Sequence, residues 1–168
     1  MITEVQATPF DQHITDHAGM IRQACIWRVK EDRIVFTNGC FDILHRGHAT
    51  YLAQARALGA SMVVALNTDA SVRRLGKGTD RPMNGLEDRL AVMAALEAVS
   101  LVTWFDEDTP LTRILECRPE VLVKGGDWAP ERIVGAQQVL EWGGAVHSIP
   151  FAHARSTTSL IERIRTGG

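Results

Sequence analysis

Two histidines, His45 and His48, lie three positions apart with Gly47 between them, shortly after an apolar run and the dipeptide Asn38-Gly39. A strand, a glycine turn and a helix start are the parts of a phosphate site, because backbone N–H groups at a helix N-terminus are unpaired and carry partial positive charge. The spacing places both imidazoles on one side of the first helical turn, and Gly47 lets a ligand approach the backbone. Two imidazole donors beside these amides would stabilise an anion whose charge grows during reaction, as phosphoryl or nucleotidyl transfer requires.

Other interpretations of this histidine pair stay open on the residues alone. A histidine near a helix start is commonly a cap or a surface residue, and a metal pair would need a third ligand that the nearby sequence does not offer. Neither a GxxxxGK[ST] loop nor a GxGxxG turn is present. His13 and His17, four apart beside Asp16, imitate a metal pair too, and a solvated helix face explains them better.

The elements that must position these residues form an alternating series. Short apolar runs predict strands at Arg33–Thr37, Ser61–Asn67, Leu101–Phe105, Val121–Lys124 and Ala145–Ile149. Helical patterns predict helices at His48–Leu58, Leu86–Val99, Thr109–Cys117, Pro130–Trp142 and Thr157–Arg165. For the second of these, Asn84 and Glu87 suggest a capping box. We therefore expect an α/β fold: a Rossmann-like, open, parallel five-stranded sheet with helices on both faces. Ligands of such sheets sit beyond the carboxyl ends of the strands, near the switch in strand order.

The first 30 residues stand outside this alternation. We expect an N-terminal extension over 1–30, with MIRQACIWRVK as an amphipathic helix docked on the domain, and a nucleotide-handling domain over 31–168. No candidate site residue falls in the extension.

Composition excludes several classes of protein. The chain has 168 residues, with 18 basic and 20 acidic side chains and a net charge of −2, which does not suggest a nucleic-acid partner. Cys25, Cys40 and Cys117 are widely spaced and contain no CxxC pair, so we expect reduced thiols in a cytoplasmic protein. No apolar run approaches the roughly 20 residues of a membrane helix, and the N-terminus lacks a signal-peptide core, so no membrane partner is expected.

The stretch TNGCFDILHRGHATYL resembles the signature of the HxGH nucleotidyltransferase superfamily, which includes cytidylyltransferases and class I aminoacyl-tRNA synthetases. Four further segments follow in order: NTDASVRRLGKG, RPMNGLEDR, VKGGDW and STTSLIERI. Together they resemble one branch closely, the D-glycero-β-D-manno-heptose 1-phosphate adenylyltransferase family, over about residues 30–166. HxGH alone marks only the superfamily, whereas five motifs in order are far more specific.

The resemblance implies a reaction in which heptose 1-phosphate attacks the α-phosphorus of ATP and pyrophosphate leaves, giving ADP-heptose for the lipopolysaccharide inner core. Catalysis would then be positioning and charge stabilisation without a covalent intermediate. His45 and His48 would contact the triphosphate, and the backbone of Thr37, Asn38 and Gly39 would touch phosphate. Mg²⁺ is expected with ATP, held largely through phosphates and water, and we name no protein ligand for it.

The same resemblance assigns roles to the charged segments that follow. Arg73, Arg74 and Lys77 form a basic cluster without an acidic partner nearby in sequence, which is either a solvated turn or a phosphate contact. Lys77 is the first candidate for that contact and Arg73 the second. Arg81 could reach the acceptor phosphate, whereas Arg89 is either part of the same site or a surface neighbour of Glu87.

Two glycines and three hydroxyl residues complete the expected nucleotide site. Gly125 and Gly126 would pack near base or ribose, Asp127 could accept from a ribose hydroxyl, and Trp128 is slightly better explained as core. Ser156, Thr157 and Thr158 precede the last predicted helix, either as its cap or as ligands of the β- and γ-phosphates.

The expected site residues fall into three groups. The catalytic group is His45, His48 and Lys77. The nucleotide-binding group is Thr37, Asn38, Gly39, Phe41, His45, His48, Gly125, Gly126, Asp127, Ser156, Thr157 and Thr158. The substrate-binding group is Asp42, Arg73, Arg81 and Lys124; Asp42 follows Phe41 in the loop and either holds that loop or contacts substrate.

Two rival functions remain at this point. A cytidylyltransferase of the same superfamily, acting on glycerol 3-phosphate or another alcohol phosphate, would carry the same HxGH and STT elements. A nucleotide-binding regulatory module without catalysis is the alternative from another class. Related bifunctional proteins carry a sugar-kinase domain that 30 residues cannot hold, so we expect a stand-alone adenylyltransferase. We also expect a homo-oligomer, because the relatives that the resemblance implies are often dimers or larger.

Overall fold

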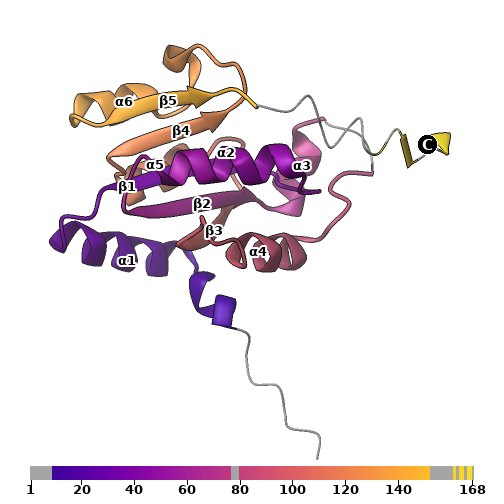
Figure 1. The fold of residues 1–168 in the computed structure, drawn as a ribbon, viewed down its shortest axis with the longest axis horizontal. Helices are drawn as coiled ribbons and strands as arrows, with labels where there is room; N and C mark the ends of the chain where they lie inside the picture. The colour runs from indigo at the N-terminus through magenta and orange to yellow at the C-terminus, as the bar shows by residue number, and fades with distance from the viewer. Residues whose placement is uncertain (1–8, 77–79, 152–160, 162, 165, 168) are drawn as a thin grey trace, which may run out of the picture.

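The computed structural model describes residues 9–76, 80–151, 161, 163–164 and 166–167. Five parallel strands form one sheet in the order β3-β2-β1-β4-β5 (Figure 1). Their bounds are β1 (Ile34–Gly39), β2 (Ser61–Asn67), β3 (Leu101–Phe105), β4 (Val121–Gly125) and β5 (Ala145–Ile149). The predicted open parallel sheet is confirmed, because continuous apolar runs of this length are buried on both faces.

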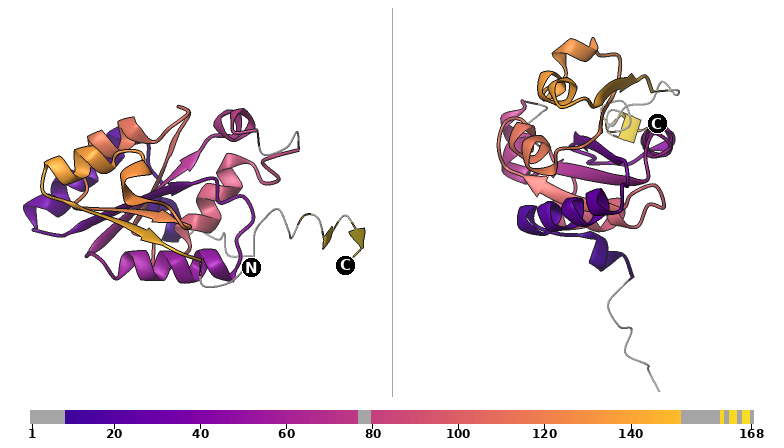
Figure 2. Two further views of the ribbon diagram at one scale, coloured as in Figure 1. Left: turned by 90° about the horizontal axis from the view of Figure 1, so that it is seen from above. Right: turned by 90° about the vertical axis from the view of Figure 1, so that its left-hand side faces the viewer.

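Helices cover both faces of this sheet, as the perpendicular views in Figure 2 show. Side chains of α2 and α4 pack into the apolar core on one face, and those of α1, α5 and α6 into the core on the other. The described helices are η1 (Pro9–His13), α1 (His17–Val29), α2 (Arg46–Arg56), α3 (Asp69–Arg74), α4 (Leu86–Ala94), α5 (Leu111–Cys117), η2 (Pro130–Arg132) and α6 (Ala136–Glu141). Most of the predicted helix at residues 157–165 lies outside the described residues.

The predicted helices over residues 48–58 and 109–117 differ from α2 and α5 by two residues at their ends, and two others differ more. The helix predicted to reach Val99 ends at Ala94 and continues in turns. The helix predicted over residues 130–142 is broken at Gly135, whose φ of +85° lies in the left-handed region. The capping box is also wrong: Gly85 is the N-cap of α4, and the Asn84 side chain donates to the Asp42 carbonyl instead.

The described part of the N-terminal segment packs into the apolar core that it shares with α5 and α6. Asp16 caps α1 by accepting from the Gly19 amide at 2.8 Å, and Met20 and Ala24 are buried against the sheet. Just before the helix, the Thr15 amide donates to the Val102 carbonyl at 3.0 Å, beside β3. The predicted helix is therefore present, while the division of the chain at residue 30 stays a prediction.

The strand order reverses direction at β1, which lies between β2 and β4. The chain runs from β1 through β2 to β3 with α2 and α4 on one face, and then returns to β4 and β5 with α5 and α6 on the other. Such a switch leaves a crevice at the carboxyl ends of the two strands that flank it, here β1 and β4. Among the described residues, no helix has the length and apolar character needed to cross a bilayer.

Candidate active site

The two histidines meet at the N-terminus of α2, directly beyond the end of β1. His45 is the N-cap residue of α2, in an extended conformation and without a side-chain cap bond, and Gly47 is buried in the first turn. The rings of His45 and His48 stack with centroids 3.9 Å apart and an angle of 26° between their planes. The sequence expectation that both imidazoles lie on one side of this turn is met.

Aromatic rings surround His48. Phe41 and Phe151 approach it edge-on, with centroids at 5.4 and 5.8 Å. Burial, and secondarily the neighbouring His45, lowers the pKa of His48 to about 4. His48 is therefore a neutral imidazole near neutral pH, and its Nδ1 has no hydrogen-bond partner among the described residues. A neutral ring held in this way can offer one N–H to a phosphate oxygen.

The end of β1 carries the predicted Thr37, Asn38, Gly39 and Phe41. Thr37 is fully buried, and its hydroxyl is hydrogen-bonded to the Tyr51 hydroxyl of α2, so its side chain is not exposed to a ligand. Burial raises the pKa of Tyr51 above its usual range, which keeps that hydroxyl protonated. Gly39 is required by packing, because a Cβ there would lie 2.9 Å from the Phe41 ring. Phe41 itself has a φ of +45°, which turns the chain towards α2.

The glycines at the end of β4 allow a close approach from β5. A Cβ on Gly125 would lie 2.8 Å from the ring of Phe151 and 3.2 Å from that of Tyr51. Gly126 has a φ of +113°, a conformation open only to glycine at little cost. Asp127 is exposed next to it. Trp128 is 48% exposed, so the interpretation of this residue as core is wrong.

Asp42 and Arg81, both predicted to bind substrate, form a buried ion pair with each other. The Asp42 carboxylate accepts from Arg81 Nε at 2.5 Å and from the amides of Met83 and Asn84 at 2.9 Å. Asp42 is 4% exposed and Arg81 7%. This geometry accords with the alternative that Asp42 holds its loop, and a substrate contact by either residue stays a prediction.

The predicted cations have different surroundings. Lys124, at the end of β4, points towards Asn38, with Nζ 3.4 Å from its Oδ1. Arg73 is exposed at the end of α3. Arg74 binds Asp108 at 2.9 Å and lies 3.7 Å from Asp106, so this member of the basic cluster does have acidic partners in the fold. Those partners follow β3 and are distant in sequence. Lys77, Ser156, Thr157 and Thr158 lie outside the described residues.

A cavity of about 350 Å³ opens on the other side of the β1 end. Its apolar wall comes from the face covered by α5 and α6, and its polar lining from the strand ends. The lining includes Asn38, Gly39, Cys40, Asn67, Phe105, Asp108, Pro110, Lys124, Trp128, Arg132 and Ile133. Sequence reasoning did not single out Asp108 and Arg132, because nothing in their local pattern indicates that two loops distant in sequence share this cavity.

The histidines and the cavity therefore lie on opposite sides of one short segment. Thr37 points towards α2, where its hydroxyl meets Tyr51, whereas the next residue, Asn38, lines the cavity. Successive side chains of a strand point to opposite faces, which explains the alternation. A group bound at Gly39 can consequently be reached from both sides.

Arg89 is a functional candidate that the sequence leaves open between a site residue and a surface neighbour of Glu87. The surface alternative is wrong, because the side chain is fully buried and donates to backbone carbonyls of the strand-end loops. The available signal was helical periodicity: Arg89 falls on the same face of α4 as the buried Leu90 and Met93. An arginine on an apolar face requires partners inside the protein.

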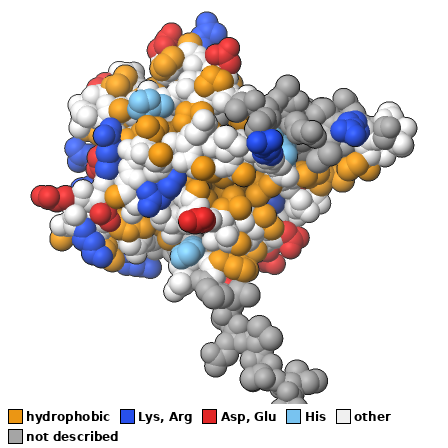
Figure 3. Space-filling model, in the orientation of Figure 1, with side chains coloured by type: hydrophobic (Ala, Val, Ile, Leu, Met, Phe, Trp, Pro, Cys, Tyr) orange, Lys and Arg blue, Asp and Glu red, His pale blue; other side chains and the backbone are white. Residues whose placement is uncertain are grey.

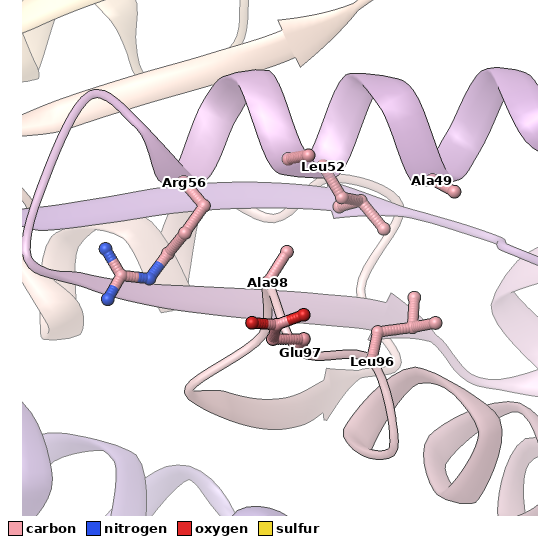
Figure 4. A pocket seen from close by; sticks show the side chains of 7 residues that line it. Ala49, Leu52, Arg56, Leu96, Glu97 and Ala98 are labelled. Carbon is pink, nitrogen blue, oxygen red and sulfur yellow. The ribbon is translucent and has the colours of Figure 1, made fainter.

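A second hollow, of about 530 Å³, lies away from the histidine rings. It runs between α2 and the segment after α4 and is lined by Ala49, Leu52, Ala53, Arg56, Leu96, Glu97 and Ala98 (Figure 4). Hydrophobic side chains gather across the middle of this face of the molecule in Figure 3. The hollow between α2 and the segment after α4 contains none of the predicted site residues. We therefore place the candidate active site at the β1 and β4 ends.

Comparisons with known proteins identify the family of this chain. The model of the cytidylyltransferase-like family matches residues 36–164. A D-beta-D-heptose 1-phosphate adenylyltransferase from Bordetella bronchiseptica is 51% identical over 94% of this chain and 97% of its own length. The bifunctional protein HldE of Geotalea uraniireducens is 54% identical over 83% of this chain, which spans only 28% of that longer relative.

Solved structures support the same fold. The lipopolysaccharide core biosynthesis protein from Thermoplasma volcanium has a TM-score of 0.59 and 26% identity, covering 74% of this chain and 99% of that one. Pantoate-beta-alanine ligase from Francisella tularensis, at 16% identity and a TM-score of 0.54 over 86% of this chain and 68% of its own, shares the fold alone. The chain therefore belongs to the cytidylyltransferase-like family, and within it to the group of nucleotidyltransferases that contains the D-beta-D-heptose 1-phosphate adenylyltransferases.

Proposed function

We propose that this protein transfers AMP from ATP to D-glycero-β-D-manno-heptose 1-phosphate, releasing pyrophosphate and forming ADP-heptose for the lipopolysaccharide inner core. The observation that carries this proposal is the 51% identity to a heptose 1-phosphate adenylyltransferase across 97% of that relative. The stacked histidines at a helix N-terminus supply the chemistry that the reaction needs.

The reaction exchanges one phosphoanhydride for another. A phosphate oxygen of the sugar phosphate attacks the α-phosphorus of ATP, and the bond from that phosphorus to the bridging oxygen of the β-phosphate breaks. Negative charge accumulates on the α-phosphoryl oxygens, so catalysis consists of alignment and charge stabilisation. His48, neutral with a pKa near 4, donates a ring N–H to this group, and His45 stacks beside it. The amides at the start of α2 add partial positive charge.

The nucleotide would lie on the histidine side, over the ends of β1 and β4. The backbone of Thr37, Asn38 and Gly39 and the glycines Gly125 and Gly126 remain our candidates for contacts to the nucleotide. The rings of Phe151 and Trp128 pack against these two glycines, and Asp127 is exposed to accept from ribose. The hydroxyls of residues 156–158 remain our candidates for the β- and γ-phosphates, and Lys77 for a cationic contact.

The acceptor would occupy the cavity on the opposite side. Lys124 and Arg132 supply cations for a phosphate, Asp108 supplies a carboxylate for sugar hydroxyls, and Trp128 supplies an apolar wall. In-line displacement requires the attacking oxygen to approach opposite to the leaving pyrophosphate. The cavity and the histidine pair both adjoin the end of β1, which supports this assignment.

Mg²⁺ would bridge phosphate oxygens of ATP and neutralise part of their charge. This ion retains water and binds substrate phosphates more readily than all-protein cages. Over residues 9–76 and 80–151 and the described C-terminal positions, no three His, Cys, Asp or Glu side chains come together as a metal cage. We further propose a cytoplasmic homo-oligomer, which light scattering on the purified protein would test.

A pyrophosphate-release assay tests the function directly. The purified chain is supplied with ATP, CTP or GTP and with heptose 1-phosphate or glycerol 3-phosphate. We expect rapid release with ATP and heptose 1-phosphate only, and ADP-heptose by mass spectrometry. A preference for CTP or for glycerol 3-phosphate would instead identify a cytidylyltransferase, and binding of nucleotide without any release would identify a regulatory module.

A further inference from the structure

The side chain of Arg89, on α4, is completely buried and joins four loop segments. Its guanidinium donates at 2.7–3.0 Å to one carboxylate and three carbonyls, which belong to the segments after β1, at the end of β2, at the start of α3 and before α4. These acceptors are Cys40 O, Asn67 O, Asp69 Oδ1 and Asn84 O.

The connection continues from Asn67 to the end of β3. Asn67 Nδ2 donates to Ser71 Oγ at 3.0 Å, and Ser71 Oγ donates to the Glu107 carbonyl at 3.0 Å. Asn67 and Ser71 are 4% and 1% exposed. We refer to Arg89, Asp69, Asn67 and Ser71 as the Arg89 network; it links the carboxyl ends of β1, β2 and β3.

A stability role alone does not account for this network. Removing an arginine from water carries a large desolvation cost, and well-packed apolar side chains of similar volume are often as stable. What an arginine adds is a rigid, planar fork that fixes several acceptors at set directions. The segments fixed here carry Cys40 and Asn67, and both residues line the cavity beside the β1 end.

We propose that Arg89 is a positioning residue that fixes the shape of the acceptor cavity, by holding the Cys40 and Asn67 segments in place. This inference rests on the proposed function for its substrate, since the cavity is assigned to the sugar phosphate. The four acceptors of Arg89 do not include the β4 glycines or the histidines. The acceptors at Cys40 and Asn67 belong to residues that line the cavity, so we expect the network to act mainly on the acceptor side of the site.

The first test separates the two substrates by steady-state kinetics. Arg89→Lys keeps the charge and loses the fork, so we expect the KM for heptose 1-phosphate to rise about tenfold or more, as for lost positioning contacts, with the KM for ATP within about twofold. Ser71→Ala, which cuts the link to the Glu107 carbonyl, should give a smaller rise of the same kind. Thermal melts check that each variant is folded.

Arg28→Lys is the matched control. Arg28 also donates from its guanidinium to a carbonyl, that of Cys117, at 2.9 Å, but this contact lies where α5 ends, before the amino-terminal end of β4 and away from the carboxyl ends of the strands. Both KM values should stay at the wild-type level in this variant. Equal rises in both KM values for folded Arg89→Lys and Ser71→Ala would overturn the proposal.

A second readout does not depend on the substrate. Cys40 lines the cavity, so its alkylation rate by iodoacetamide, followed site by site with mass spectrometry, reports the cavity's shape. We expect a rise of about threefold or more in Arg89→Lys, as local opening increases, and no change in Arg28→Lys. Wild-type rates and an unchanged acceptor KM would overturn the inference. If the wild-type chain transfers no AMP to the sugar phosphate, the proposed function fails. The alkylation rate of Cys40 in Arg89→Lys then still shows whether Arg89 fixes the shape of the cavity.

Discussion

At the scale of single residues, the site depends on how His48 is held. Its ring is stacked on His45 and bordered by the edges of Phe41 and Phe151, which fixes its orientation before any ligand arrives. A donor that is already oriented costs no reorganisation during the reaction, and this is the main source of electrostatic catalysis. The histidines are therefore where a small chemical change should have the largest effect on rate.

Replacing either histidine should reduce turnover without unfolding the protein. For His45→Ala and His48→Ala we expect kcat to fall about 10²–10³-fold, the usual loss for one transition-state donor. His147→Ala is the matched control, because His147 is exposed on β5 and away from the site, and its kcat should be unchanged. Turnover near wild-type in both site variants would show that the pair is not catalytic.

The low pKa of His48 also makes stability depend on pH. Its pKa is about 4 in the folded protein against an ordinary 6.5, so the unfolded chain binds more protons between these values. The free energy of unfolding should therefore fall as the pH is lowered from 6.5 to 4. In His48→Gln this component should vanish, so urea melts of the two proteins at several pH values should converge towards pH 4. Parallel curves would mean that His48 is not buried as described.

At the scale of elements, strands were easier to predict than helix ends and side-chain partners. The runs at 61–67, 101–105 and 145–149 agree with β2, β3 and β5. The signal is strongest for β2, because a strand covered on both faces is apolar through most of its length. Helix ends depend on contacts that are distant in sequence: Asn84 was free to cap α4 but is held by Asp42. Arg74, with its acidic partners beyond β3, was missed for the same reason.

The contact between β4 and the residue after β5 can be tested through Gly125. In Gly125→Ala the new methyl would meet the Phe151 ring at 2.8 Å, and relieving that overlap should cost about 1–3 kcal/mol in the free energy of unfolding. It should also displace Phe151 from His48 and weaken nucleotide binding. Gly85→Ala is the control, since a Cβ there meets only Asp69 Oδ2, at 4.0 Å. Denaturant melts and ATP titration of both variants test this prediction. Equal losses of stability and of ATP affinity in Gly125→Ala and Gly85→Ala would contradict it.

At the scale of the whole molecule, the sheet and both helical layers fold around two apolar cores. The alternation of strands and helices predicts this architecture, and the position of the site follows from the switch in strand order. What the sequence could not show is that α1 completes one of these cores, because nothing in its pattern identifies the surface on which it packs. Met20 is fully buried there.

Truncating Met20 should therefore destabilise the whole domain. We expect Met20→Ala to lower the free energy of unfolding by about 2–4 kcal/mol, as for other buried methionines. Val29→Ala, at a position 87% exposed on the same helix, should change it by less than about 0.5 kcal/mol. Both should unfold in one transition by circular dichroism. A separate early transition for α1 would show that the helix is an accessory to the domain.

The pleat of β1 has a kinetic consequence. Thr37 faces α2 and Asn38 faces the cavity, so the two sides of the strand end have different neighbours. With ATP on the histidine side and the sugar phosphate in the cavity, as proposed above, neither substrate would block the other, and we expect no fixed order of addition. Double-reciprocal plots with either partner varied should intersect, and each should bind alone in calorimetry.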